Sequence, residues 1–91
     1  MDFEWDENKR FSNIRKHSID FINVVAIFEN DTIIIEDERS NYGEQRFILI
    51  GLLEGRVIVV VYTERKDKIR IISARKATKN EERSYFEQLP H

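Results

Sequence analysis

Residues 56–89 decide the fold, and they read RVIVVVYTER, KDKIRIISARKAT and KNEERSYFEQL in that order. The first piece is apolar at almost every position from Val57 to Thr63 and is rich in β-branched side chains. Such a run, bounded by turn signals, is typical of a central strand that is buried on both faces. The last piece follows Thr78, which with Glu81 has the spacing of a capping box and predicts the start of a helix. We therefore expect two antiparallel strands and a closing helix.

The second strand of this pair, Ile69–Ala74, is apolar but interrupted. Arginines lie at both ends of the hairpin, Arg65 near its tip and Arg75 where the strand gives way to the helix. Because side chains alternate along an extended chain, the two sides of this strand should carry different residues. One side is predicted to present Ile69, Ile71, Ser73 and Arg75, and the other side Arg70, Ile72 and Ala74.

The residues before the hairpin predict two helices and two further strands. Asp6 has the character of an N-cap and predicts a helix that ends at about His17. After a break at residues 18–20, apolar side chains at i, i+3, i+4 and i+7 predict a second helix that packs on a core. These apolar positions are Phe21, Val24, Val25 and Phe28, and the strands that follow are expected at Asp31–Glu36 and Gln45–Leu52, with Leu53–Gly55 as a tight hairpin.

Connections this short force the strands to pair antiparallel in sequence order. The predicted fold is α+β: two N-terminal helices, a four-stranded antiparallel meander and a C-terminal helix, in a single domain of residues 1–91. Phe3–Trp5 alternates and is expected to be only a short extended piece. Apolar side chains on both faces of the sheet leave an exposed surface for a partner, unless the last helix folds back and covers it.

The composition argues against several classes of protein. The chain has no cysteine, and its two histidines form no HxH or HxxxH pair, so neither a disulfide nor a metal site is expected. No cofactor is expected, because GxGxxG, P-loop and GxSxG motifs are absent. The acidic run Glu36–Glu38 lacks calcium-loop spacing and is expected to be a solvated strand end. Without an apolar run of about 20 residues or a signal peptide, we expect a cytoplasmic protein without a membrane contact.

Charge is divided unevenly along the chain. Residues 1–45 carry eleven acidic and five basic side chains, whereas residues 46–91 carry six acidic and ten basic ones. A local basic patch, and not the total charge of −2, sets the field that a phosphate meets. One face of the domain could therefore bind nucleic acid, although a split of this size also arises by chance in many domains.

Cleavage of RNA by its own 2′-OH needs residues of the kinds found here and no metal. It requires a base near the hydroxyl, cations around the phosphate and a proton for the departing 5′ oxygen. Arg65 and Arg75 are the predicted phosphate clamps, because a planar guanidinium holds two oxygens at once, although each could be an ordinary surface residue. His17 is the predicted acid or base, because an imidazole titrates close to neutral pH. A cation in the last turn of a helix also has a simpler explanation, which is the helix dipole.

Further residues are predicted to hold the backbone and the bases of RNA. Two alternatives stay open: a module that binds RNA or protein without chemistry, and a structural subunit whose cations only keep it in solution. The predicted RNA-binding residues are Lys16, Lys66, Lys68, Arg70, Lys76, Lys79, Arg83 and Tyr85, with Tyr62 as a second candidate for stacking.

Several stretches resemble, in order, a known bacterial family. They are FEWDENK at 3–9, NIRKHSIDF at 13–21, IGLLEG at 50–55, YTER at 62–65 and RIISARKATKNEERSYF at 70–86. The family is BrnT, the toxins of type II toxin–antitoxin pairs, and the likeness covers nearly the full length. Ser18 departs from the family pattern, which has glycine after the Lys-His pair; the departure affects the turn between helices and not the chemistry.

The resemblance implies a RelE-like fold and a metal-independent ribonuclease that shuts down translation. It also implies a cognate antitoxin of the BrnA type, a ribbon-helix-helix protein that would form a two-plus-two complex with the toxin. Promoter DNA would then be contacted only through the antitoxin. Lys16, His17, Arg65 and Arg75 match family motif positions, and the resemblance does not say which residue acts as the base.

Overall fold

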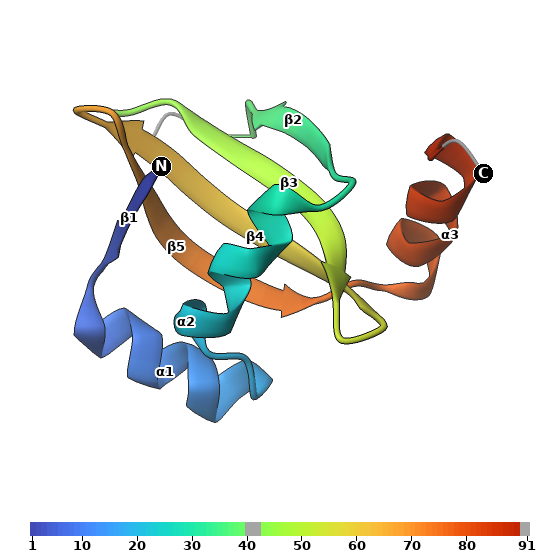
Figure 1. Cartoon of the computed structure of the whole chain (residues 1–91), viewed down its shortest axis with the longest axis horizontal. Helices are drawn as coiled ribbons and strands as arrows, with labels where there is room; N and C mark the ends of the chain where they lie inside the picture. The colour runs from blue at the N-terminus through green and yellow to red at the C-terminus, as the bar shows by residue number, and fades with distance from the viewer. Residues whose placement is uncertain (40–42, 90–91) are drawn as a thin grey trace.

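The computed structural model describes residues 1–39 and 43–89, and Figure 1 shows the arrangement of their elements. Strands and helices confirm the predicted α+β class. In chain order the elements are β1 (Asp2–Trp5), α1 (Glu7–His17), α2 (Phe21–Val24), the 3-10 helix η1 (Val25–Glu29), β2 (Ile33–Asp37), β3 (Arg46–Leu53), β4 (Arg56–Arg65), β5 (Lys68–Lys76) and α3 (Lys79–Gln88).

The sheet has five strands in the order β1-β5-β4-β3-β2. Strands β2 to β5 form the predicted antiparallel meander, but β1 adds a parallel strand at the β5 edge, with Phe3 opposite Ile69. The prediction of a four-stranded, purely antiparallel sheet was therefore wrong. The N-terminal piece is anchored by ring contacts, because Phe3 packs on Phe28 with centroids 5.0 Å apart and Trp5 packs on Phe21 at 6.2 Å.

Two tight turns set the register of the meander. Glu54 and Gly55 join β3 to β4, and Lys66 and Asp67 join β4 to β5; all four residues have positive φ, between 50° and 81°. Two-residue turns with positive φ match the right-handed twist of the strands they connect. The predicted hairpins are confirmed. The second turn has two non-glycine residues in the left-handed region, a conformation that is unfavourable for residues with a side chain.

A bulge in β5 changes which side chains share a face. Val61 lies opposite Ser73 but Tyr62 lies opposite Ile71, so Ile72 is the extra residue. Ile71 belongs to the buried core, whereas Ser73 lines the opposite face of the sheet. The prediction that Ile71 and Ser73 point to the same side was therefore wrong, because strict alternation fails at a bulge.

Helices α1 and α2 and the η1 segment cover one face of the sheet (Figure 1). The second predicted helix is only one α-helical turn, which continues as the 3-10 helix η1, so the prediction of two N-terminal α-helices was only partly right. The break falls at Val24 and Val25, two β-branched residues of low helix propensity. The core beneath these helices contains Ile19, Phe21, Val24, Ile27, Leu49, Ile58, Val60, Tyr62, Ile69, Ile71 and Ala74.

Helix α3 lies at one end of the sheet, away from α1 (Figure 1). The predicted capping box is present: the Thr78 hydroxyl accepts from the Glu81 amide at 3.2 Å, and the Glu81 carboxylate accepts from the Thr78 amide at 2.8 Å. Tyr85 anchors the helix, because its ring is buried and its hydroxyl donates to the Asp31 carbonyl at 2.8 Å. The apolar face opposite the core is thus only partly covered by α3.

Candidate functional site

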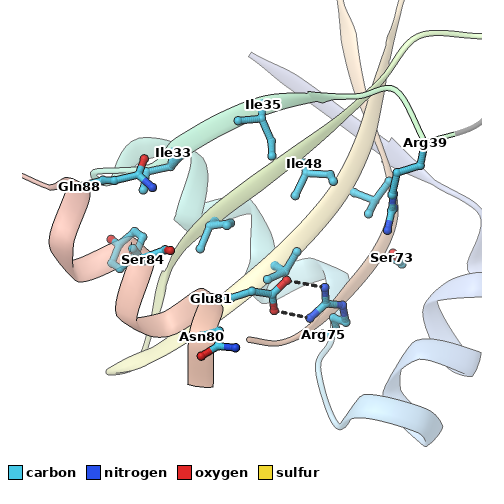
Figure 2. Close-up of a pocket in the computed structure, with 14 residues that line it drawn as sticks. Ile33, Ile35, Arg39, Ile48, Ser73, Arg75, Asn80, Glu81, Ser84 and Gln88 are labelled. Atoms are coloured by element: carbon cyan, nitrogen blue, oxygen red, sulfur yellow. Dashed lines mark hydrogen bonds and ion pairs between the residues drawn. The ribbon is translucent and has the colours of Figure 1, made fainter. Parts of the chain in front are cut away.

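A groove of about 520 Å³ lies between α3 and the sheet face opposite the core. Strand pairing puts two rows of side chains on its floor: Ile35, Ile48, Val61 and Ser73 in one row, and Ile33, Ile50, Val59 and Arg75 in the other. Figure 2 shows how α3 forms a polar wall while Arg39 reaches in from the end of β2. That wall consists of Asn80, Glu81, Ser84, Tyr85 and Gln88. The groove therefore has an apolar floor and charged or polar walls.

Arg75 and Glu81 form a bidentate ion pair inside the groove (Figure 2). The Nη1 and Nη2 atoms of Arg75 donate to the two carboxylate oxygens of Glu81 at 2.8 and 2.9 Å. This contact, helped by the Thr78 amide and opposed by burial, lowers the pKa of Glu81 from 4.5 to about 2. Glu81 also raises the pKa of Arg75, while burial and the positive charge of Arg39 act against that rise. Both groups are charged at neutral pH, and Arg39 and Arg75 meet in one groove.

Arg39 is held by the carboxylate of Asp37, which was expected to be solvated. Its Nε and Nη2 atoms donate to Asp37 at 2.8 and 2.9 Å, and the Asp37 side chain is fully buried. Arg39 thereby keeps the pKa of Asp37 below its ordinary value, against the effect of burial. The expectation of a solvated strand end was wrong for Asp37, because pairing of β2 with β3 turns this residue inward against Arg46. Arg39 was not among the residues predicted from the sequence to form a site.

Arg65 lies at the other end of the hairpin from Arg75. It donates to Glu44 at 2.7 Å and lies opposite Lys68, beside the turn. The residue opposite Arg75 is Val59, six positions before Arg65 on the same strand, which corresponds to about 20 Å at the rise of a β-strand. Arg65 does not line the groove, so the two predicted clamps are not brought together in this conformation.

His17 lies on the other side of Ser73 from the groove. With Lys16 it borders a shallow depression of about 190 Å³ that also includes Ile72 and Ser73. Ser73 lines the groove as well, so one small residue of β5 separates the His17 side from the Arg75 side.

Asn13 fixes α1 beside β5. Its Nδ2 donates to the carbonyls of Ile19 and Ala74 at 2.9 and 2.8 Å, and its Oδ1 accepts from the Ala74 amide at 3.1 Å. Beyond Ile71, where β1 no longer pairs with β5, this side chain takes over the hydrogen bonding of the strand edge. The position of Lys16 and His17 next to Ser73 therefore depends on Asn13.

The predicted RNA-binding residues fall into separate groups. Arg70 donates to Glu4 at 2.7 Å on the β1 side of the sheet. Tyr85 and Tyr62 are only 1% and 4% exposed, so neither ring offers a face to a base in this structure. The exposed lysines and arginine lie near the turn between β4 and β5 (Lys66, Lys68), near α3 (Lys76, Lys79, Arg83) or on α1 (Lys16).

In the part of the chain that the structure describes, no three acidic or histidine side chains are grouped so that they could hold a metal ion. Within residues 1–39 and 43–89, no helix has the length and apolar character needed to span a membrane.

The fold and the groove define a small α+β protein whose sheet carries a groove lined by isoleucines and valines together with the guanidinium groups of Arg39 and Arg75. Comparison with family models matches residues 5–81 to the ribonuclease toxin BrnT of type II toxin–antitoxin systems. The chain therefore belongs to the BrnT family, and the resemblance inferred from sequence is confirmed. Membership of a type II toxin family implies an antitoxin partner. No curated protein gives a significant match.

Proposed function

We propose that the chain is a metal-independent endoribonuclease that cleaves RNA at the groove through attack of a 2′-OH on the adjacent phosphate. The observation that carries this proposal is the meeting of Arg39 and Arg75 in one groove, with His17 just beyond Ser73. Guanidinium groups are suited to the charge that builds on a phosphate in the transition state. Cleavage of messenger RNA would inhibit translation.

The roles follow from position. Arg75 contacts the scissile phosphate, with Arg39 as the second cation of the groove. His17, exposed at the end of α1, donates a proton to the departing 5′ oxygen as the strand passes over Ser73. Arg65 and the lysines beside the turn hold the RNA backbone farther along the strand.

We further propose that the partner is a ribbon-helix-helix antitoxin of the BrnA type in a two-plus-two complex that contacts promoter DNA only through the antitoxin. Its support is exposed apolar surface. Ile34 and Ile35 on the edge strand β2 are 51% and 52% exposed, and isoleucines form much of the groove floor. An antitoxin segment that covered this face would block access of RNA to Arg75.

One observation favours a module that binds RNA without cleaving it. Arg39, Arg65, Arg70 and Arg75 each already have a carboxylate partner, which weakens their pull on a phosphate. In that case, RNA would bind with a strong dependence on salt and would remain intact.

Incubation of the purified chain with end-labelled RNA in excess EDTA tests the proposal. We expect cleavage by the wild type and a loss of at least about 100-fold in Arg75→Lys, because lysine keeps the charge but not the planar fork. Arg56→Ala is the matched control, since Arg56 is an exposed arginine of β4 outside the groove, and it should cleave normally. Intact RNA with the wild type, in EDTA and at low salt, would refute the proposal.

A further inference from the structure

We infer that Glu81 is the general base of this reaction and that Arg75 holds it beside the scissile phosphate. This inference rests on the proposed function. The sequence explains Glu81 fully as a helix cap, because the carboxylate closes the capping box with Thr78. A cap does not need an arginine, however, and this carboxylate binds Arg75 through both of its oxygens within the groove.

The geometry of Arg75 leaves room for a phosphate next to Glu81. The guanidinium donates to Glu81 through Nη1 and Nη2, and Nη1 also donates to the Lys76 carbonyl at 3.3 Å, whereas Nε has no hydrogen-bond acceptor among the described residues. A phosphate can therefore bind at the Nε side of the guanidinium while Glu81 stays bound to Nη1 and Nη2. One guanidinium then holds the phosphate and the carboxylate side by side, which is where the 2′-OH of the preceding ribose must lie.

Both groups can be reached from solvent. The side chain of Arg75 is 40% exposed and that of Glu81 is 31% exposed. The neighbouring side chains on α3, Asn80 and Ser84, are polar and also line the groove, so they can hydrogen-bond to ribose or base. The helix thus presents a carboxylate and neutral hydrogen-bonding groups on one wall.

The step balances without a metal. The 2′ oxygen forms a bond to phosphorus while its proton passes to the Glu81 carboxylate. The bond from phosphorus to the 5′ oxygen breaks, and that oxygen takes a proton from the His17 imidazolium. The products are a 2′,3′-cyclic phosphate and a 5′-hydroxyl, and proton exchange with water restores Glu81 and His17.

Substrate binding should improve Glu81 as a base. In the free protein Arg75 lowers the pKa of Glu81 to about 2, which makes the carboxylate a weak proton acceptor. The other charged or titratable groups that line the groove are Arg39 and Tyr85, and the Tyr85 hydroxyl is engaged with Asp31. A bound phosphate adds negative charge next to Glu81 and offsets part of the positive charge of Arg75, and both effects raise the pKa of the carboxyl group.

Glu81→Gln is the direct test in the full-length chain. Glutamine retains an oxygen for the Thr78 amide and is accepted in a capping box, so the fold should survive. We expect single-turnover cleavage to fall by about 100- to 10,000-fold, with little change in the RNA concentration at half-maximal rate, and we expect the acid limb of the pH–rate profile to disappear. Glu82→Gln is the matched control, because Glu82 is the exposed neighbouring glutamate on α3 outside the groove.

A measurement on the wild type does not depend on that variant. The pKa of the ¹³C-labelled Glu81 carboxyl group can be followed by NMR with and without a single-stranded DNA oligonucleotide, which lacks the attacking 2′-OH. We expect the pKa to rise clearly from about 2 when the oligonucleotide saturates the groove. An unchanged value with the oligonucleotide bound at Arg75 would overturn the inference.

The outcomes separate this inference from the proposed function. Absence of cleavage by the wild type in EDTA refutes the function itself, and the inference with it. Cleavage by Glu81→Gln at the wild-type rate across the pH range, or faster cleavage, refutes only the role of Glu81 as a base. A loss of rate with the acid limb still present would show that Glu81 only positions Arg75, and this result also counts against the inference.

Discussion

Replacement of Asn13 by alanine tests the hydrogen bonds that attach α1 to strand β5 of the sheet. The buried amide makes three hydrogen bonds, two to backbone groups of Ala74 and one to the carbonyl of Ile19. Each is worth about 1 kcal/mol net, and backbone groups left buried without partners add to the cost. We expect Asn13→Ala to lower the free energy of unfolding by about 3–4 kcal/mol. A domain of this size has about 5–14 kcal/mol of stability, so the variant should still fold at 25 °C.

Equilibrium unfolding in urea measures the effect. A loss of this size moves the midpoint down by about 1–4 M while the slope stays constant. Asn23→Ala is the matched control, because Asn23 is an exposed asparagine on α2, and its unfolding free energy should change by no more than about 0.5 kcal/mol. A loss below about 1 kcal/mol for Asn13→Ala would show that water replaces the amide at the β5 edge, and the reasoning on how Lys16 and His17 are positioned would fail.

Three further predictions concern other parts of the fold. Gly51→Ala places a Cβ 2.5 Å from the Cγ2 of Ile27 and should lower stability by about 1–3 kcal/mol, measurable as a lower urea midpoint. The pKa of Asp20 is lowered from 3.8, so the charged carboxylate stabilises the fold above pH 3.8, and this contribution is lost as the pH falls. In Asp20→Asn, the free energy of unfolding should therefore decrease less between about pH 4 and lower pH than in the wild type, as measured by unfolding at a series of acid pH values. Tyr85→Phe removes the hydrogen bond to Asp31 and should cost about 1 kcal/mol by urea unfolding, whereas Tyr85→Ala should cost about 3–5 kcal/mol.

The meander could be predicted from the sequence because its strands pair with neighbours that lie close along the chain. Two apolar runs separated by a two-residue turn can pair in few ways, and the turns at Gly55 and Lys66 fix the register. The fifth strand could not be predicted in this way, because Phe3 pairs with a residue far along the chain and is held by rings from η1 and the core. The bulge at Ile72 was also invisible, since an apolar residue fits either an alternating or a bulged strand.

The ion pair in the groove was not predicted from the sequence, although both of its residues were singled out there. Arg75 was selected for its charge and Glu81 for its place in a capping box, and both assignments describe local chemistry. Their ion pair depends on the path of the chain between β5 and α3, which no spacing rule specifies. Arg39 was missed for a related reason: its partner Asp37 is buried only after β2 pairs with β3, and in the sequence it looks like one of three solvated acids.

Under the proposed function, the ion pairs of the arginines assign different roles in RNA binding to arginine and lysine. Arg39 and Arg75 in the groove are each already paired with a carboxylate. The affinity of a phosphate for these residues should therefore come more from directed hydrogen bonds than from the release of counterions. The exposed lysines at the two ends of β5 have no carboxylate in ion-pair contact within residues 1–39 and 43–89. These lysines should therefore set the salt dependence of affinity, at a slope of about 0.7 per phosphate contact for single strands, whereas the arginines should set the rate of cleavage. If the roles divide in this way, added salt will weaken the affinity for RNA without changing the rate at which bound RNA is cleaved. If salt lowers both the affinity and the cleavage rate, the paired arginines also supply the general electrostatic attraction for RNA.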